Sequence, residues 1–180
     1  MISLEKGNKL SDFRYEELFQ FGEDNTEYRK LDTEKIGISK FKNRSILNIP
    51  HKIIEHLTKE AFNDISHFLR KDHLKQLAKI LKDPEASSND KYVALTLLKN
   101  ANVAAGGILP MCQDTGTAIV LANKGSLIWT GYNDKEYISK GIWQAYKESN
   151  LRYSQMAPIT MYEEINTKTN LPAQIDILAT

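Results

Sequence analysis

The stretch Gly106-Gly107-Ile108-Leu109-Pro110-Met111-Cys112-Gln113-Asp114-Thr115-Gly116-Thr117 separates two kinds of sequence pattern. Before it, apolar residues recur at three- and four-residue steps, which is typical of amphipathic helices. Just after it, short continuous apolar runs are typical of strands. Both kinds of element therefore contribute to the fold. We predict an α/β (mixed α+β) domain in which several amphipathic helices pack on a small sheet.

Three helices are predicted before this stretch and one after it. The first begins after Pro50, and Asp72 is a candidate cap for the second, which Asp83–Pro84 ends. The Ser87–Asp90 cluster is typical of a cap at the start of the third, and Gly106–Gly107 ends it. Their apolar stripes are Ile54, Leu57, Ala61, Ile65, Phe68 and Leu69; Leu74, Leu77, Ala78 and Leu81; Val93, Leu97, Ala101 and Ala104; and, between Asp134 and Ser149, Ile138, Ile142, Ala145 and Tyr146.

Strands are predicted on both sides of the helical region. Ile36–Ile38 and Ser45–Ile49 are short candidates within residues 1–50, which otherwise look like an irregular arm. Thr117–Ala122 and Leu127–Thr130 are short apolar runs joined through Asn123-Lys124-Gly125, which predicts a β-hairpin.

The last strand predicted is Ala173–Leu178, after a loop-rich tail with Pro158 and Pro172. We expect no partner for this strand in the chain. Because an unpaired apolar strand is a liability for a finished domain, we interpret the sequence as part of a longer protein.

Composition excludes several classes of protein. The 180 residues carry a formal net charge of +1, which argues against nucleic acid or an anionic membrane as the main partner. No apolar run approaches the roughly 18 residues of a membrane span. The single cysteine, Cys112, excludes an internal disulfide and fits a reducing compartment. We expect a cytoplasmic protein, or one of the mitochondrial matrix if the source is eukaryotic.

The residue types around Cys112 leave its role open. A structural thiol in a tight turn is one interpretation. A nucleophile would need a histidine nearby in space, and all four histidines fall on or beside the first two predicted helices. A metal thiolate would need further ligands, and the chain has no second cysteine to supply one.

Several longer blocks of the sequence resemble the class I fumarases, which are oxygen-sensitive iron–sulfur hydratases. The blocks are Asp83–Leu95, Leu109–Ala118, Trp129–Gly131, Asn150–Gln155 and Asn166–Asp176. They occur in the order that the family has, and the likeness extends from about residue 20 to residue 177. Such a series is far more specific than one short motif.

The resemblance implies the reversible hydration of fumarate to (S)-malate. In the family, three cysteines hold a [4Fe–4S] cluster, and Cys112 matches the first of them. The other two lie beyond residue 180. Asp114 matches the family's general acid, Gln113 a residue that hydrogen-bonds substrate, and Arg152 an arginine that binds a substrate carboxylate.

Residues 51–180 would then be the N-terminal part of the catalytic domain. The complete enzyme would be a homodimer that binds fumarate and malate. The 180 residues alone would bind no cluster and have no activity.

Other interpretations remain open at the level of sequence. Asp114 also fits a turn residue, and Arg152 also fits a residue that stabilises the C-terminal end of a helix. A tartrate dehydratase-type hydro-lyase shares the same kind of Cys-Gln-Asp loop. The third alternative is a non-catalytic module for folding or dimer contact.

Overall fold

The computed structural model describes residues 27–31, 36–111, 116–131, 133–149, 151 and 155–180. The chain divides into two units, Met1–Lys30 and Leu31–Thr180. In the first unit, the described residues 27–30 form no helix or strand. All helices and strands that the structure describes lie in the second unit. The division predicted at residue 50 stays a prediction.

Four helices occur in the described residues, as the apolar periodicity predicts. They are α1 (His51–His67), α2 (Lys71–Ile80), α3 (Ser88–Ala104) and α4 (Asp134–Glu148). The cap predicted for α3 is confirmed, because the Ser87 hydroxyl accepts from the Asp90 backbone and the Asp90 carboxylate accepts from the Ser87 backbone. The cap predicted for α2 is wrong. That helix begins at Lys71, so Asp72 lies inside its first turn, where it accepts a 2.9 Å hydrogen bond from Lys75.

The strands form three small sheets in the described part of the chain. Their bounds are β1 (Gly37–Phe41), β2 (Arg44–Asn48), β3 (Ile119–Lys124), β4 (Ile128–Trp129), β5 (Met156–Pro158), β6 (Glu164–Asn166) and β7 (Gln174–Ala179). The orders are β1-β2-β4, β3-β7 and β5-β6. Mixed α+β architecture is therefore confirmed.

The predicted hairpin between β3 and β4 is wrong. A tight bend does follow β3, and the Ile128 N–H donates to the Gly125 carbonyl at 3.0 Å. Beyond this bend the two strands take different partners: β3 pairs in parallel with β7, and β4 pairs in parallel with β2. Local turn chemistry marks the bend, but the choice of partner depends on residues far away in the sequence.

The end of the chain also differs from the expectation. The strand predicted at Ala173–Leu178 corresponds to β7, and it is not unpaired, because Ile175 lies opposite Val120 in a six-residue register with β3. The tail before it contains the antiparallel pair β5–β6, which the sequence did not predict. Each of these two strands has three residues, too few for a clear alternating pattern.

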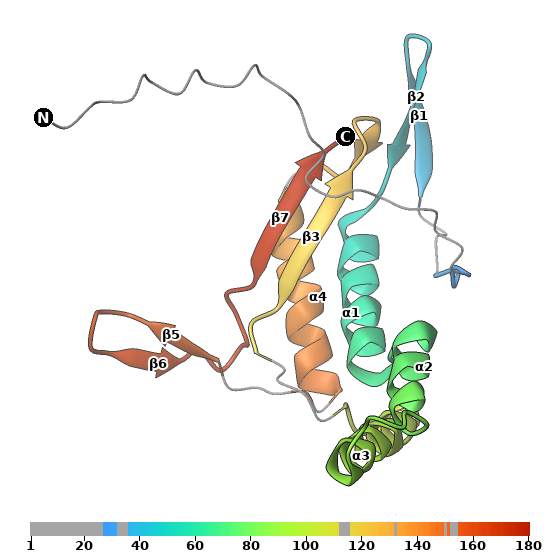
Figure 1. Ribbon diagram of the computed structural model, residues 1–180. Helices are drawn as coiled ribbons and strands as arrows, with labels where there is room; N and C mark the ends of the chain where they lie inside the picture. Colours follow the sequence, from blue (N-terminus) through green and yellow to red (C-terminus); the bar gives the residue numbers. More distant parts are fainter. Residues whose placement is uncertain (1–26, 32–35, 112–115, 132, 150, 152–154) are drawn as a thin grey trace, which may run out of the picture. The chain divides into compact units, whose positions relative to one another are not determined.

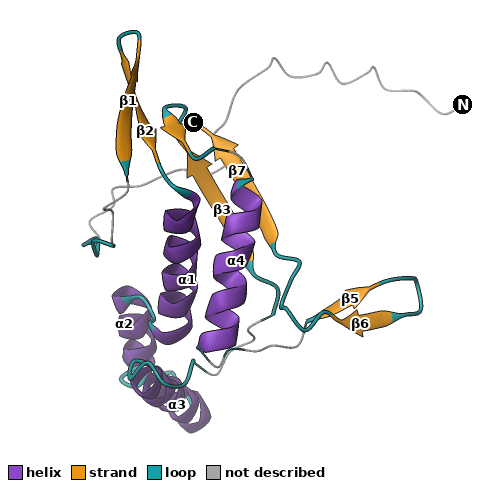
Figure 2. Ribbon diagram, turned by 180° about the vertical axis from the view of Figure 1, so that it is seen from behind, coloured by secondary structure: helices purple, strands orange, loops and turns teal. Residues whose placement is uncertain are grey.

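The main core lies where α1, α4 and the β3–β7 pair meet, and Figures 1 and 2 show these elements side by side from opposite directions. Ile142 and Ala145 on α4 are fully buried. The other buried members of this cluster are Phe62, Ala118, Ile138, Tyr146, Leu151 and Ile175. Burial of a side chain the size of Ile142 stabilises the fold by about 1.5–3 kcal/mol. A second, smaller cluster joins Ala101 and Ala104 of α3 to Met111.

Across the described ranges, no helix is long and apolar enough to cross a membrane.

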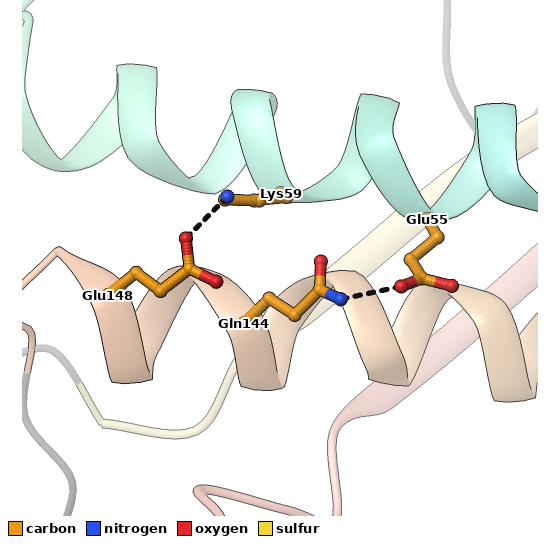
Figure 3. A network of polar contacts seen from close by, with 4 residues as sticks. All are labelled: Glu55, Lys59, Gln144 and Glu148. Carbon is orange, nitrogen blue, oxygen red and sulfur yellow. Dashed lines mark hydrogen bonds and ion pairs between the residues drawn. The ribbon is translucent and has the colours of Figure 1, made fainter.

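Helices α1 and α4 approach each other closely at Gly141. A Cβ atom at this position would lie 2.4 Å from the Glu55 carbonyl oxygen and 2.7 Å from the Thr58 Cβ atom. Two polar pairs also join the same helices: Lys59 with Glu148 at 2.5 Å, and Gln144 with Glu55 at 2.6 Å (Figure 3). A residue without a side chain is therefore what permits this separation of the helices.

A half-buried polar cluster joins the end of β3 to the start of α4. The Lys124 ammonium donates to the Thr130 hydroxyl and pairs with Asp134 at 2.6 Å. Burial raises the pKa of Asp134, but hydrogen bonds from Lys124 and Thr130 and the charge of Lys124 outweigh this effect, so that its pKa lies below the usual value. Asp134 also stands in the first turn of α4, where the helix dipole favours a negative charge.

Substitution Gly141→Ala should destabilise the fold. Alanine is favoured over glycine inside a helix by about 1 kcal/mol, but overpacking of a tight contact costs about 1–3 kcal/mol or more. Here the clash is with a backbone oxygen, which cannot rotate away, so we expect a net loss of at least about 1 kcal/mol in urea unfolding followed by circular dichroism. Gly37→Ala is the matched control, because no atom lies within 4 Å of its added Cβ. Equal stability of the two variants would contradict the close approach of the helices.

Substitution Asp134→Asn should lower the free energy of unfolding at pH 7 and make it less dependent on pH in the acid range. A carboxyl group whose pKa is lowered by folding stabilises the protein above its unfolded pKa of about 4, and this contribution disappears as pH falls through the folded value. We therefore expect the urea midpoints of the wild type and the variant to differ at pH 7 and to converge towards pH 2–3.

Asp72→Asn is the control for this experiment. Its carboxylate also pairs with a lysine in the first turn of a helix, and its pKa is also lowered by hydrogen bonding to that lysine, but the pair is exposed to solvent. The effect at pH 7 should be much smaller, because solvent screens exposed pairs. Parallel pH curves for the wild type and Asp134→Asn would refute the assigned role of Asp134.

Candidate functional site

The four residues predicted from sequence for the site fall outside the described residues. Cys112, Gln113 and Asp114 belong to the segment 112–115, and Arg152 belongs to the segment 152–154. Their roles stay predictions. The structure does describe the residues on both sides of each segment, and the contacts of these flanking residues are given below.

The segment 112–115 follows a firmly held residue. Met111 is 5% exposed and packs in the cluster with Ala101 and Ala104 of α3. Its backbone N–H donates to the Ser66 carbonyl oxygen at the end of α1, at 2.9 Å. Helices α1 and α3 together therefore fix the position from which Cys112 follows.

The same segment ends at a residue held by α4. The Tyr146 hydroxyl donates to the Gly116 carbonyl oxygen at 3.0 Å. Two residues later, Ala118 is buried in the main core and leads into β3. A side chain from a helix thus determines where the chain leaves the segment.

The segment 152–154 is also held on both sides. Leu151 is 3% exposed and belongs to the main core cluster. On the other side, the Gln155 side-chain amide donates to the Pro172 carbonyl oxygen at 2.9 Å. The Gln155 carbonyl oxygen accepts from the Thr167 N–H at the same distance.

Two of the contacts that hold these flanks lie near the C-terminal end of α4. Tyr146 and Leu151 belong to one buried cluster and also line one cavity of about 480 Å³. The other lining residues are Trp143, Lys147, Lys168, Thr169 and Asn170. The Lys147 ammonium lies 4.9 Å from the centre of the Trp143 ring.

The described residues offer no ready metal centre. Among them, no group of three or more His, Cys, Asp and Glu side chains could hold a metal ion. His51 stacks on Tyr137 with ring centroids 4.1 Å apart, and the buried His67 ring donates from Nδ1 to the Asn63 carbonyl oxygen at 2.8 Å. Both histidines therefore have structural roles at the two ends of α1.

Sequence reasoning missed the hydrogen bond from the Tyr146 hydroxyl to Gly116. The periodicity of α4 placed it on the core stripe with Ile142 and Ala145, which is correct. A buried tyrosine, however, needs a partner for its hydroxyl, and this need was the available signal.

The structure also explains why glycine stands at position 131, in one of the blocks quoted above. The φ angle of Gly131 is +82°, and an added Cβ would lie 2.8 Å from His51 Nε2.

The similarity of this chain to known proteins extends over most of its length. A sequence model of the family described as "Fumarate hydratase (Fumerase)" matches residues 55–180. The chain is 52% identical over 167 residues to the anaerobic class I fumarate hydratase of Escherichia coli K12, covering 93% of this chain and 30% of that protein. For the aerobic class I enzyme of the same strain, the identity is 50% with the same coverage.

A eukaryotic protein gives a similar result. The chain is 48% identical over 174 residues to fumarate hydratase 2 of Leishmania major, covering 94% of this chain and 31% of that protein. The chain thus spans about a third or less of the length of the curated relatives it matches. Because the family model matches more than half of the 180 residues, this chain belongs to the fumarate hydratase (Fumerase) family.

Proposed function

We propose that these 180 residues form the N-terminal part of a class I fumarate hydratase, a hydro-lyase that interconverts fumarate and (S)-malate. The observation that carries this proposal is the 52% identity to a class I fumarate hydratase over 93% of the chain. Since the chain spans 30% of that protein, the activity is assigned to a longer polypeptide that contains these residues.

Elimination of water from malate requires movement of a proton and orientation of two carboxylates. In the proposed site, Asp114 is the acid that assists departure of the hydroxyl group. The Arg152 guanidinium binds one substrate carboxylate, for which its planar fork of donors is suited. The Gln113 amide forms a further hydrogen bond to the substrate. The flanks of the two segments support this proposal. Gly116 follows segment 112–115 and is held by Tyr146, and Leu151 precedes Arg152. Tyr146 and Leu151 belong to one core cluster.

The iron–sulfur cluster that the resemblance implies does not fit the residues of this chain alone. Cys112 is its only cysteine, and the described residues contain no group of three candidate ligands. In a longer protein, Cys112 would supply one thiolate of a [4Fe–4S] cluster, and the remaining ligands would come from outside residues 1–180. Homodimer formation is proposed for that longer protein.

Fumarate is favoured over tartrate as the substrate. The relatives compared above are named as fumarate hydratases, and their identities of 48–52% extend over at least 93% of the chain. Comparison of turnover with malate, meso-tartrate and L-tartrate in the longer protein tests this preference directly.

The 180-residue chain alone should not hydrate fumarate. It offers one cluster ligand and lacks the groups that the rest of such a protein would supply. We expect no loss of fumarate absorbance after anaerobic reconstitution with iron and sulfide. Turnover that persists in metal-stripped, repurified protein would refute the assignment of the activity to a longer polypeptide.

In the longer protein, Asp114→Asn should lower kcat by roughly 100-fold or more, since removal of a general acid typically costs this much. Asparagine preserves the size of the side chain and can still serve in a turn, so iron and sulfide content should stay normal. Cys112→Ala is the contrasting variant, because loss of a thiolate ligand should reduce iron content and the cluster absorption as well as activity.

The ratio of activity to iron content separates the two roles. If Asp114→Asn keeps near-normal turnover, or loses activity only in proportion to lost iron, Asp114 is a structural residue and not the acid. Normal iron content in Cys112→Ala would exclude this cysteine as a ligand.

A further inference from the structure

An open groove of about 430 Å³ lies between α2 and α3, which Figures 1 and 2 show side by side. Cavities of this size are typical of binding sites in proteins. None of the four residues proposed above for catalysis, substrate or cluster lines it. Its lining residues are Leu77 and Ile80 of α2, Asp83, Glu85 and Ala86 of the connection between the helices, and Asp90, Val93, Ala94 and Leu97 of α3.

Most of these lining residues are apolar, and part of the lining is open to solvent. Val93 is 46% exposed and Leu97 44%, although both side chains are large and apolar. Ala86 and Ala94 carry only a methyl group and leave space between the two helices. Since protein interiors are close-packed, exposed apolar side chains around such a space indicate a surface that another segment covers.

Helix α3 carries apolar side chains around most of its circumference. In the described part of the chain it packs mainly against α2, and its alanines 94, 101 and 104 are buried. Its exposed large apolar residues are Tyr92, Val93, Leu95, Leu97 and Val103. A helix that is apolar on all sides is normally surrounded by other parts of a protein. Helix α3 therefore has more apolar surface than the described elements cover.

One end of the groove is negatively charged. Asp83 and Glu85 follow the end of α2, and Asp90 lies in the first turn of α3. Hydrogen bonds from Ser87 lower the pKa of Asp90, so this carboxylate is charged at neutral pH. The described lining residues include no lysine or arginine. An apolar groove with such an end fits an amphipathic segment that brings apolar side chains together with a lysine or arginine.

The remaining part of the longer polypeptide is the best source of this segment. The chain spans 30% of the class I fumarate hydratase that it matches, so most of that protein has no counterpart here. A segment of the same polypeptide is held near the groove at a high effective concentration, which a separate partner would not be. The block Asp83–Leu95, which forms much of the groove, also has no other role in the proposed site.

We propose that the groove between α2 and α3 is an internal docking surface for an amphipathic segment that follows Thr180 in the longer polypeptide. Apolar side chains of this segment pack against Val93 and Leu97, and its lysine or arginine lies at the acidic end beside Glu85. The inference rests on the proposed function only in assuming that the chain is the N-terminal part of that polypeptide.

The first test places the photo-crosslinking amino acid p-benzoylphenylalanine at Val93 in the longer protein. Val93 is suited because it lines the groove and its exposed side chain leaves room for the larger group. After irradiation we expect a cross-link, within one molecule, to residues beyond Thr180, identified by mass spectrometry of the digested protein. Lys75 is the control position, because it lies on α2 outside the groove with 63% of its side chain exposed. The yield there should be at least about tenfold lower, since charged helix faces stay in water.

The position and size of the cross-linked product decide the result. A cross-link between two copies, a cross-link only to other residues within 1–180, or no cross-link at all would overturn the proposal. Products within one molecule and between copies differ in mass on a denaturing gel. Hydratase activity is not needed for this readout, so an inactive longer protein that still forms the cross-link would refute the proposed function and leave the docking surface intact.

Glu85→Lys tests the charge of the docked segment. This substitution should lower, by about 0.3 M or more, the urea concentration at which the cross-link from position 93 falls to half, because a lysine here repels a basic side chain. Glu163→Lys is the matched control, since it makes the same change at an exposed position outside the groove, and it should leave this concentration unchanged. Equal values for the wild type and Glu85→Lys would overturn the basic character of the segment.

Discussion

The close contact of α1 with α4 at Gly141 is the constraint on which the rest of the structure depends. Because no side chain stands at this position, the helix backbones approach until Glu55 and Thr58 lie directly over it. The residues next to it on α4, Ile142 and Ala145, are then fully buried against α1 and the β3–β7 pair. Two polar pairs, Lys59 with Glu148 and Gln144 with Glu55, join the same two helices.

This packing also holds residues that flank the segment 112–115. Tyr146 lies one turn beyond Ile142 on the same helix, so its ring enters the same core and its hydroxyl reaches Gly116. The end of α1 supplies the other fixed point, through the contact of Ser66 with Met111. Helices α1 and α4 thus hold the residues on both sides of this segment, Met111 and Gly116.

The parallel pairing of β3 with β7 has a further consequence. Val120 and Ile177 pack against the core, whereas Ile119, Leu121 and Leu178 are exposed on the described surface. Parallel sheets in proteins are almost always covered on both faces and rarely consist of two strands. The exposed apolar side chains therefore agree with the finding that the chain spans about a third of its relatives' length.

The sequence by itself determined the four helices, the cap of α3 and the family. Each of these depends on local information: a repeat of three to four residues, a hydrogen bond between Ser87 and Asp90, or blocks of matching residues. Tertiary structure alone decided the partners of β3 and β4, since strand pairing joins residues that no local pattern connects. It also decided that Tyr146 holds Gly116, because burial at a helix contact fixes a hydroxyl in space while periodicity fixes only its side of the helix.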